Sequence, residues 1–332
     1  MNVKKYYSIP YVSNSSLSWF QVSPLYCRKR MRGEIEEANK SYLTLGTQVH
    51  LSLLEPEAFR SMYAVIDAQI PKTETQKQFA STYLELVRAG IDEEKAALTA
   101  YRENYVFEKK TDKVIANNIQ RLLTDLDKYI SYLRAKGEYV EILSTSNFNL
   151  IQSVISTVKN HKKAKELFDL NGEEECRDVL ESDIEAYNEL PIFWEYPIIT
   201  DGKPIMCKSL IDRLIINHKE KKITLVDLKT TSKLGAFKDI FESYKYHRQL
   251  SFYWGAIESK FTEFTDYSRE TYIVACSTVE PLECRVFSIG QEFLDKGTLE
   301  IAELMQDISW HILSDSWDYP REYYEGDGTE IL

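Results

Sequence analysis

Two stretches decide the fold: Pro204–Asn217, PIMCKSLIDRLIIN, and Lys222–Thr230, KITLVDLKT. Both are rich in β-branched residues, so they predict two neighbouring strands. Side chains two apart on a strand face the same side of a sheet, so Asp227 and Lys229 should project together. Asp212 lies on the first of these strands, and adjacent strands can bring its carboxylate within a few ångström of Asp227.

The sequence on either side of this pair continues the sheet. We expect strands at Leu190–Ile199, Thr271–Val279 and Glu283–Ile289, and helices at Tyr244–Ser259 and Gln291–Leu313. The resulting order is β-β-β-α-β-β-α. It predicts an α/β fold in which a mixed central β-sheet is flanked by helices.

The first half of the chain has the patterns of helices. They are expected from the capping serines Ser15 and Ser16 to Gln21, after Ser23-Pro24, and at Leu43–Leu54, 74–106, 114–136 and Phe148–Lys165. We therefore expect a helical N-terminal region over residues 1–170 and a sheet core over 171–332, integrated into one domain. The boundary is placed in the acidic run Gly172–Glu189.

The acidic pair on the two strands indicates a metal site. Like charges directly opposite destabilise a strand pair, and a divalent cation offsets that cost. Mg²⁺ favours one or two carboxylates together with water and phosphate oxygens. Lys229 would then lie beside the cation, where it can stabilise charge on a phosphoryl group or orient water. The alternative is a hairpin with solvated acids and Lys229 as a salt-bridge partner; Asp212 on the neighbouring strand favours the metal site.

Other polar residues allow two interpretations each. Glu195 interrupts an apolar strand, as an accessory metal or water ligand or as an edge residue facing solvent. Gln249 and Tyr253 share one helix face, with Tyr246 a turn earlier, and this stripe can contact a nucleotide or pack on the sheet. His50 is a core histidine or the residue that completes a metal site.

Composition sets further limits. The net charge of −11 argues against a protein coated by nucleic acid, but it does not describe the local field in a cleft. Basic paths for DNA are offered by Arg28-Lys29-Arg30 with Arg32 and by Lys159–Lys165, or these are solvated helix faces. Five scattered cysteines without a CxxC pair suit a reducing cytoplasm. No secretory signal or membrane-spanning stretch is evident.

These motifs occur in an order that resembles a known family. Asp212, Asp227-x-Lys229 and Gln249-x-x-x-Tyr253 resemble the RecB-like branch of the PD-(D/E)XK nucleases. The stretches Leu45-Gly46-Thr47-Gln48-Val49-His50 and Tyr246-His247-Arg248-Gln249 resemble its exonuclease VIII (RecE) type. The matches span roughly residues 15–255. Residues 70–145 have no counterpart that we can align, and Lys208 stands where relatives often have glycine.

The resemblance implies a site and an activity. It implies a restriction-endonuclease-like core, metal ligation by His50, Asp212 and Asp227, a catalytic Lys229, and Gln249 and Tyr253 near DNA; Tyr246 and Arg248 are expected there too. Magnesium, replaceable by manganese, would be the cofactor. Some relatives hold an iron–sulfur cluster, but Cys276 and Cys284 lack CxxC partners here, so no cluster is expected.

The expected function is that of an exodeoxyribonuclease acting on the ends of linear double-stranded DNA. Such enzymes work in recombination with a strand-annealing protein of the RecT type, often on phages or prophages. A homo-oligomer is a further expectation, and a membrane partner is not expected. Two alternatives remain: a single-strand or structure-specific endonuclease of the same fold, and a catalytically silent DNA-binding or assembly protein.

Overall fold

The computed structural model describes residues 3–35, 41–105, 111–138, 141–168, 183–200 and 203–329. The chain divides into two compact units, residues 1–55 with 154–332, and residues 56–153. This division differs from the boundary expected near residue 170, much of whose acidic run lies outside the described residues. The reason is that the first helices pack with the sheet, whereas the segment after Glu55 forms a core of its own.

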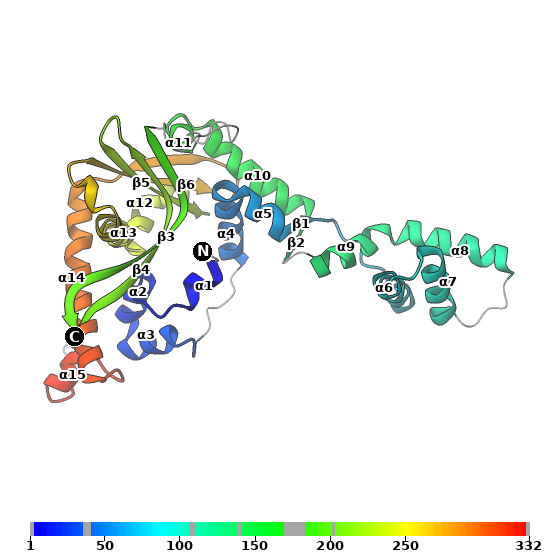
Figure 1. Ribbon diagram of the computed structural model, residues 1–332, viewed down its shortest axis with the longest axis horizontal. Coiled ribbons are helices and arrows are strands. Elements are labelled where there is room, and N and C mark those ends of the chain that lie inside the picture. The colour runs from blue at the N-terminus through cyan, green and yellow to red at the C-terminus, as the bar shows by residue number, and fades with distance from the viewer. Residues whose placement is uncertain are drawn as a thin grey trace. The chain divides into compact units, whose positions relative to one another are not determined.

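A five-stranded sheet organises the first unit (Figure 1). Its strands are β3 (Ile184–Thr200), β4 (Lys203–Asn217), β5 (Lys222–Thr231), β6 (Ser268–Ser277) and β7 (Cys284–Ser288), side by side in that order. All neighbours are antiparallel except β5 and β6, which are parallel. The expected mixed sheet is confirmed, although its first strand begins six residues earlier than predicted.

Helices flank this sheet. The connection from β5 to β6 runs through η2 (Leu234–Ala236), α12 (Phe237–Ser243), α13 (Tyr246–Lys260) and η3 (Thr262–Phe264). After β7 come α14 (Gln291–Ser314) and α15 (Arg321–Glu325). Helices α13 and α14 pack on each other and on β3, and their apolar residues join the core formed by Leu214, Leu225 and Ile273. The α/β prediction is therefore confirmed.

The N-terminal helices belong to the same unit: α1 (Val3–Ser8), α2 (Asn14–Val22), α3 (Pro24–Met31) and α4 (Ser41–Leu54). Ser13, not Ser15 or Ser16, caps α2; its hydroxyl accepts the N–H of Ser16, whose hydroxyl accepts the N–H of Ser13. Ser23 caps α3 as expected. Lys208 donates from Nζ to carbonyl oxygens at the end of α1 and just after it, those of Tyr6, Tyr7 and Ile9.

Helix α4 lies against β4 and β5. A Cβ atom at Gly46 would come within 2.9 Å of Thr230 Oγ1, so the missing side chain allows the close approach. His50 follows one turn later on the same helix. This packing places α4, which is distant in the sequence, next to the paired strands β4 and β5.

The second unit is helical: α5 (Pro56–Met62), β1 (Tyr63–Val65), α6 (Glu74–Arg88), α7 (Glu93–Asn104), α8 (Asp112–Asp125), α9 (Asp127–Glu138), β2 (Glu141–Leu143) and the start of α10 (Thr145–Asn160). Each helical stretch expected here is two helices, and Gly90 adopts φ +84° at one of the breaks. Its core holds Phe79, Ala97 and Tyr101. Strands β1 and β2 pair in parallel.

Helix α10 leads back to the first unit, where α11 (Lys162–Phe168) follows it. The single helix expected over Phe148–Lys165 is thus two helices. Within the described ranges, no helix is both long and apolar enough to cross a bilayer.

Candidate active site

The strands β4 and β5 separate where the acidic residues lie. Their last paired residues are Arg213 and Val226. Asp212 is the next residue of β4 beyond this last pair. Its side chain replaces a main-chain carbonyl as hydrogen-bond acceptor, because Oδ2 accepts the N–H of Leu228 on β5 at 2.7 Å. Asp212 is thus buried and fixed beside β5.

The second acid is held by its own strand and by α13. Asp227 is only 1% exposed, and the ammonium of Lys229 lies 2.8 Å from its Oδ2. Gln249 donates its side-chain amide to Asp227 Oδ1 at 3.2 Å and to the hydroxyl of Tyr253 at 2.8 Å. The stripe of Gln249 and Tyr253 therefore faces the acidic centre and orients Asp227.

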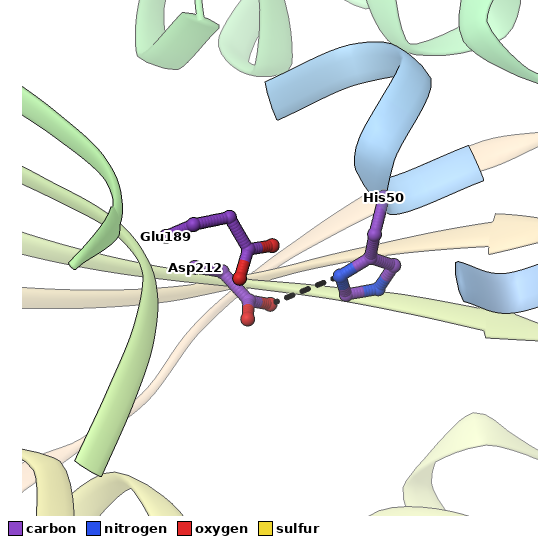
Figure 2. A group of neighbouring side chains, drawn as sticks. All are labelled: His50, Glu189 and Asp212. Atoms are coloured by element: carbon purple, nitrogen blue, oxygen red, sulfur yellow. Dashed lines mark ion pairs between the residues drawn. The ribbon is translucent and has the colours of Figure 1, made fainter. Parts of the chain in front are cut away.

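Three side chains come together beside this pair. The ligand atoms of His50, Glu189 and Asp212 all lie within 4.8 Å of one another, as Figure 2 shows. His50 Nδ1 is 3.7 Å from Asp212 Oδ2. The expected ligand set named Asp227 together with His50 and Asp212. The group of neighbouring ligand atoms contains Glu189 instead, and Asp227 is engaged by Lys229 and Gln249, so metal ligation by Asp227 stays a prediction.

Glu189 was missed by the sequence analysis, which singled out Glu195. Glu189 lies opposite Asp212, between the pairs Asn188–Arg213 and Leu190–Ile211. Counting outward from the turn would place Pro191 there instead, but an irregularity between Tyr196 and Ile199 shifts the register by two residues. Glu195 is exposed on the edge strand and pairs with Met206, outside the group.

The backbone at Glu189 is itself unusual, with φ +45°. The alternation of core residues changes phase there: on β4, Cys207 and Ile211 precede the change, and Leu214 follows it after only three residues. A left-handed residue of this kind costs free energy and is typical of functional sites. The irregular point of both strands therefore coincides with the acidic group.

The electrostatics of the group leave excess negative charge. Burial, and then the neighbouring acid Asp212, raises the pKa of Glu189 to about 8. Burial also raises the pKa of Asp227, to about 6. Burial alone would lower the pKa of Lys229, but Asp227 and Asp212 outweigh it and hold that pKa above its usual value. One ammonium thus serves the two carboxylates Asp227 and Asp212, with the carboxyl group of Glu189 beside Asp212, and a divalent cation would balance the remaining negative charge.

The donor set fits such a cation. Burial, followed by the charge of Lys229, lowers the pKa of His50 to about 4, so its imidazole is neutral and able to bind a metal. One imidazole nitrogen and carboxylate oxygens within 4.8 Å suit Mn²⁺ or Mg²⁺ completed by water. His50, Glu189 and Asp212 are the residues that would hold the ion.

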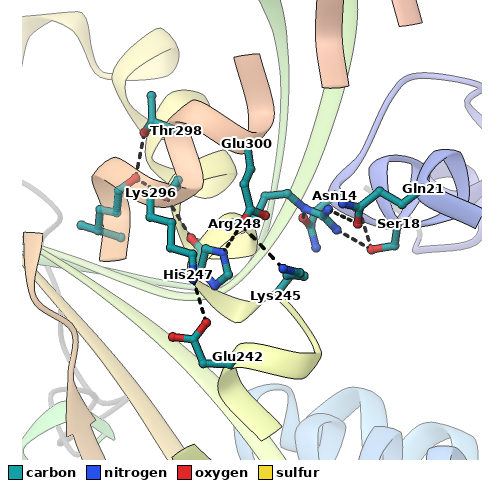
Figure 3. Close-up of polar contacts among 12 residues, drawn as sticks. Asn14, Ser18, Gln21, Glu242, Lys245, His247, Arg248, Lys296, Thr298 and Glu300 are labelled. Carbon is teal, nitrogen blue, oxygen red and sulfur yellow. Dashed lines mark hydrogen bonds and ion pairs between the residues drawn. The ribbon is translucent and has the colours of Figure 1, made fainter. Parts of the chain in front are cut away.

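The two residues before Gln249, His247 and Arg248, anchor helix α13 to α14 and α2 (Figure 3). Arg248 is completely buried and donates to α2, with Nε to Asn14 Oδ1 at 3.1 Å, Nη1 to Gln21 Oε1 at 2.6 Å and Nη2 to Ser18 Oγ at 2.6 Å. His247 Nε2 is 2.9 Å from Glu300 Oε1 on α14. Arg248 was expected near DNA, but its guanidinium is used inside the protein. Its task is to fix the helix that carries Gln249.

Tyr246 lies closer to the acidic group. Its ring centroid is 4.8 Å from the ammonium of Lys229, in a cation–π contact. Tyr246 and Lys229 are both only partly buried. The centre therefore has one side, formed by Lys229 and Tyr246, that approaches the surface.

One comparison with known proteins bears on this arrangement. Residues 195–319 match a family described as a PDDEXK-like domain of unknown function (DUF3799). The fold is PDDEXK-like. The matched part of the PDDEXK-like fold contains Asp212, Asp227, Lys229 and Gln249, whereas His50 lies before it and is placed at the site by the packing of α4.

Solved structures give weaker likenesses. A protein from Eubacterium rectale, provisionally described as an exonuclease, has a TM-score of 0.47 and 10% identity, over 97% of this chain and 89% of that one. A structure named SSO0001 has a TM-score of 0.25 and 12% identity, over 71% and 92%. Neither likeness carries an argument about this chain. Among curated proteins, the comparison finds no match.

Proposed function

We propose that the protein is a metal-dependent exodeoxyribonuclease that hydrolyses phosphodiester bonds at the ends of linear double-stranded DNA. The observation that carries the proposal is the acidic group at the split between β4 and β5, with Lys229 2.8 Å from Asp227 and a neutral His50 beside Asp212. The PDDEXK-like match over residues 195–319 supports nuclease chemistry on this fold.

Each residue has a task in this proposal. His50, Glu189 and Asp212 hold a divalent cation, which supplies Lewis-acid stabilisation and lowers the pKa of water. Lys229 offers its ammonium to the charge that develops on the phosphoryl oxygens. Asp227 keeps that ammonium in place, and Gln249 orients Asp227. Asp227 stays a candidate ligand of the same cation, as the resemblance implies.

The metal is proposed to be Mg²⁺ or Mn²⁺. Mg²⁺ prefers oxygen ligands, whereas an imidazole is better suited to a transition metal. Because His50 contributes nitrogen, we expect Mn²⁺ to bind more tightly than Mg²⁺. Ca²⁺ is larger and its coordination is looser, so it should support DNA binding without turnover.

The preference for DNA ends rests on the resemblance to the exonuclease VIII type. On the same resemblance we propose a role in recombination, with a RecT-like strand-annealing protein as partner, in a phage or prophage. We also propose a cytoplasmic location and a homo-oligomer. Tyr246, Gln249 and Tyr253 stay candidates for DNA contact.

The test is a digestion of end-labelled linear duplex and of closed circular duplex, each with Mn²⁺, Mg²⁺ or EDTA. We expect linear DNA to be degraded, circular DNA to survive and EDTA to stop the reaction. Cleavage of the circle would support the endonuclease alternative. Tight DNA binding in Ca²⁺ with no cleavage in either metal would support a catalytically silent protein, and full activity in EDTA would exclude the metal site.

A further inference from the structure

A second tyrosine extends the aromatic side of the centre to the surface. The ring of Tyr244 stacks on that of Tyr246, with centroids 5.9 Å apart and planes at 20°. Tyr246 in turn contacts Lys229 through its ring. Tyr244 is nevertheless 65% exposed, so most of its side chain is open to solvent.

The backbone between the two tyrosines is fixed. Lys245 adopts a left-handed conformation with φ +57° immediately before the first residue of α13. Its ammonium lies 3.7 Å from Glu300 Oε1, the same oxygen that contacts His247. A large aromatic ring held in place and left exposed gains nothing from burial, so its position favours contact with another molecule.

Free positive charge lies in the same segment. Lys233 and Lys238 are exposed on either side of η2, and within the described part of the chain neither has a carboxylate partner. Helix α12 carries two acids. Glu242 is paired with Lys296, so Asp239 is the one acid of this helix that can offset the two lysines. The segment after the candidate catalytic strand thus offers two free ammonium groups and an open aromatic face, which suits a polyanion that carries rings.

We propose that Tyr244 stacks against an unpaired nucleobase of the DNA strand whose phosphate lies at Lys229. The inference rests on the proposed function and adds the form of substrate that the site holds. The Tyr246 ring links the two groups: its centroid is 4.8 Å from the Lys229 ammonium and 5.9 Å from the Tyr244 centroid, so Tyr244 lies within a few nucleotides' reach of a phosphate at Lys229.

A paired base inside a duplex stacks on its neighbours and presents only its edges in the grooves. A protein ring can cover a base face only on the outer side of the terminal pair or where the strands are separated. The proposed contact is of the second kind: the terminal base pairs are separated when DNA occupies the centre, and Tyr244 stabilises the opened strand. Stacking does not depend on base identity, since every base has a π face, so the contact adds no sequence preference.

The test measures DNA binding in Ca²⁺, so that no turnover is needed. Three fluorescent probes are compared: a single strand, a duplex with a mismatched, open end, and a duplex whose terminal pairs are cross-linked. The variants are Tyr244→Ala, Tyr244→Phe and the control Tyr319→Ala. Tyr319 is a matched control because it is 48% exposed and stacks on Tyr323.

Tyr244→Ala should weaken binding of the single strand and of the open duplex about tenfold, the size of one base–aromatic contact. Tyr244→Phe and Tyr319→Ala should bind as the wild type does, and the cross-linked duplex should bind Tyr244→Ala and wild type alike. Unchanged binding by Tyr244→Ala, or an equal loss on the cross-linked duplex, would overturn this inference alone. Failure of the wild type to bind any probe would overturn the proposed function as well.

Discussion

The carboxylate of Asp212 accepts the main-chain N–H of Leu228 at 2.7 Å, across the point where β4 and β5 part. One side chain thereby does two things: it satisfies a buried donor, and it brings a negative charge next to His50 and Glu189. The two contributions can be separated by mutation, because an amide oxygen can still accept a hydrogen bond while carrying no charge.

Asp212→Asn should keep the fold and lose metal binding. Asp212→Ala should lose metal binding too and, in addition, about 1–3 kcal/mol of unfolding free energy, because the N–H of Leu228 is left buried without a partner. Urea unfolding of both variants in EDTA measures the difference. Equal stability of the two variants would mean that the hydrogen bond contributes nothing.

Lys229→Ala should reduce cleavage about a hundredfold or more while DNA binding in Ca²⁺ persists, because the ammonium acts on developing phosphoryl charge. Lys229→Arg should not restore the rate, since a planar guanidinium cannot take the place of a compact ammonium between Asp227 and the Tyr246 ring. Single-turnover cleavage of linear duplex is the measurement. A near wild-type rate for Lys229→Ala would remove Asp227 and Lys229 from the active centre.

Glu189→Gln and His50→Ala should each weaken Mn²⁺ binding at least tenfold, as expected for loss of a ligand from the group of three. Glu195→Gln is the matched control on the same strand, because that carboxylate is exposed and outside the group. Calorimetric titration with Mn²⁺ and the melting temperature are measured on each variant. If His50 serves only the core, His50→Ala will melt earlier yet bind Mn²⁺ normally.

The raised pKa of Glu189 predicts how the metal-free protein responds to pH. Its folded-state pKa of about 8 lies above the ordinary 4.5, so the folded state binds the extra proton. The associated stability is present below about pH 4.5 and is lost as the pH rises through about 8. Glu189→Gln should therefore become steadily more stable than the wild type between pH 5 and 8 in EDTA, and Mn²⁺ should remove that advantage. Melting temperatures of Glu189→Gln and wild type are measured at each pH, and a difference between them that stays constant from pH 5 to 8 would contradict this.

Arg248→Ala should destabilise the protein by about 2–5 kcal/mol, because it leaves a cavity and three acceptors of α2 without their donor. Arg248→Lys should recover only part of this, since one ammonium cannot reproduce the planar fork. Denaturant unfolding provides the values. If Arg248 contacts DNA instead, Arg248→Ala will keep its stability and lose affinity for DNA.

The sequence determined the strand pair and its chemistry. The alternation of Ile223, Leu225, Asp227 and Lys229 is local, so it correctly places the last two on one face of β5 whatever the rest of the chain does. The hydrophobic pattern likewise predicted the order of strands and helices, because each element must bury its apolar side.

The tertiary structure decided which side chains meet. Glu189 reaches Asp212 because of a register shift that no local pattern encodes, and His50 arrives only because Gly46 lets α4 approach β5. Arg248 has the residue type of a DNA contact, yet α2 takes up its guanidinium. Periodicity fixes the face on which a side chain lies, whereas its partners depend on register and on packing between segments far apart in the chain.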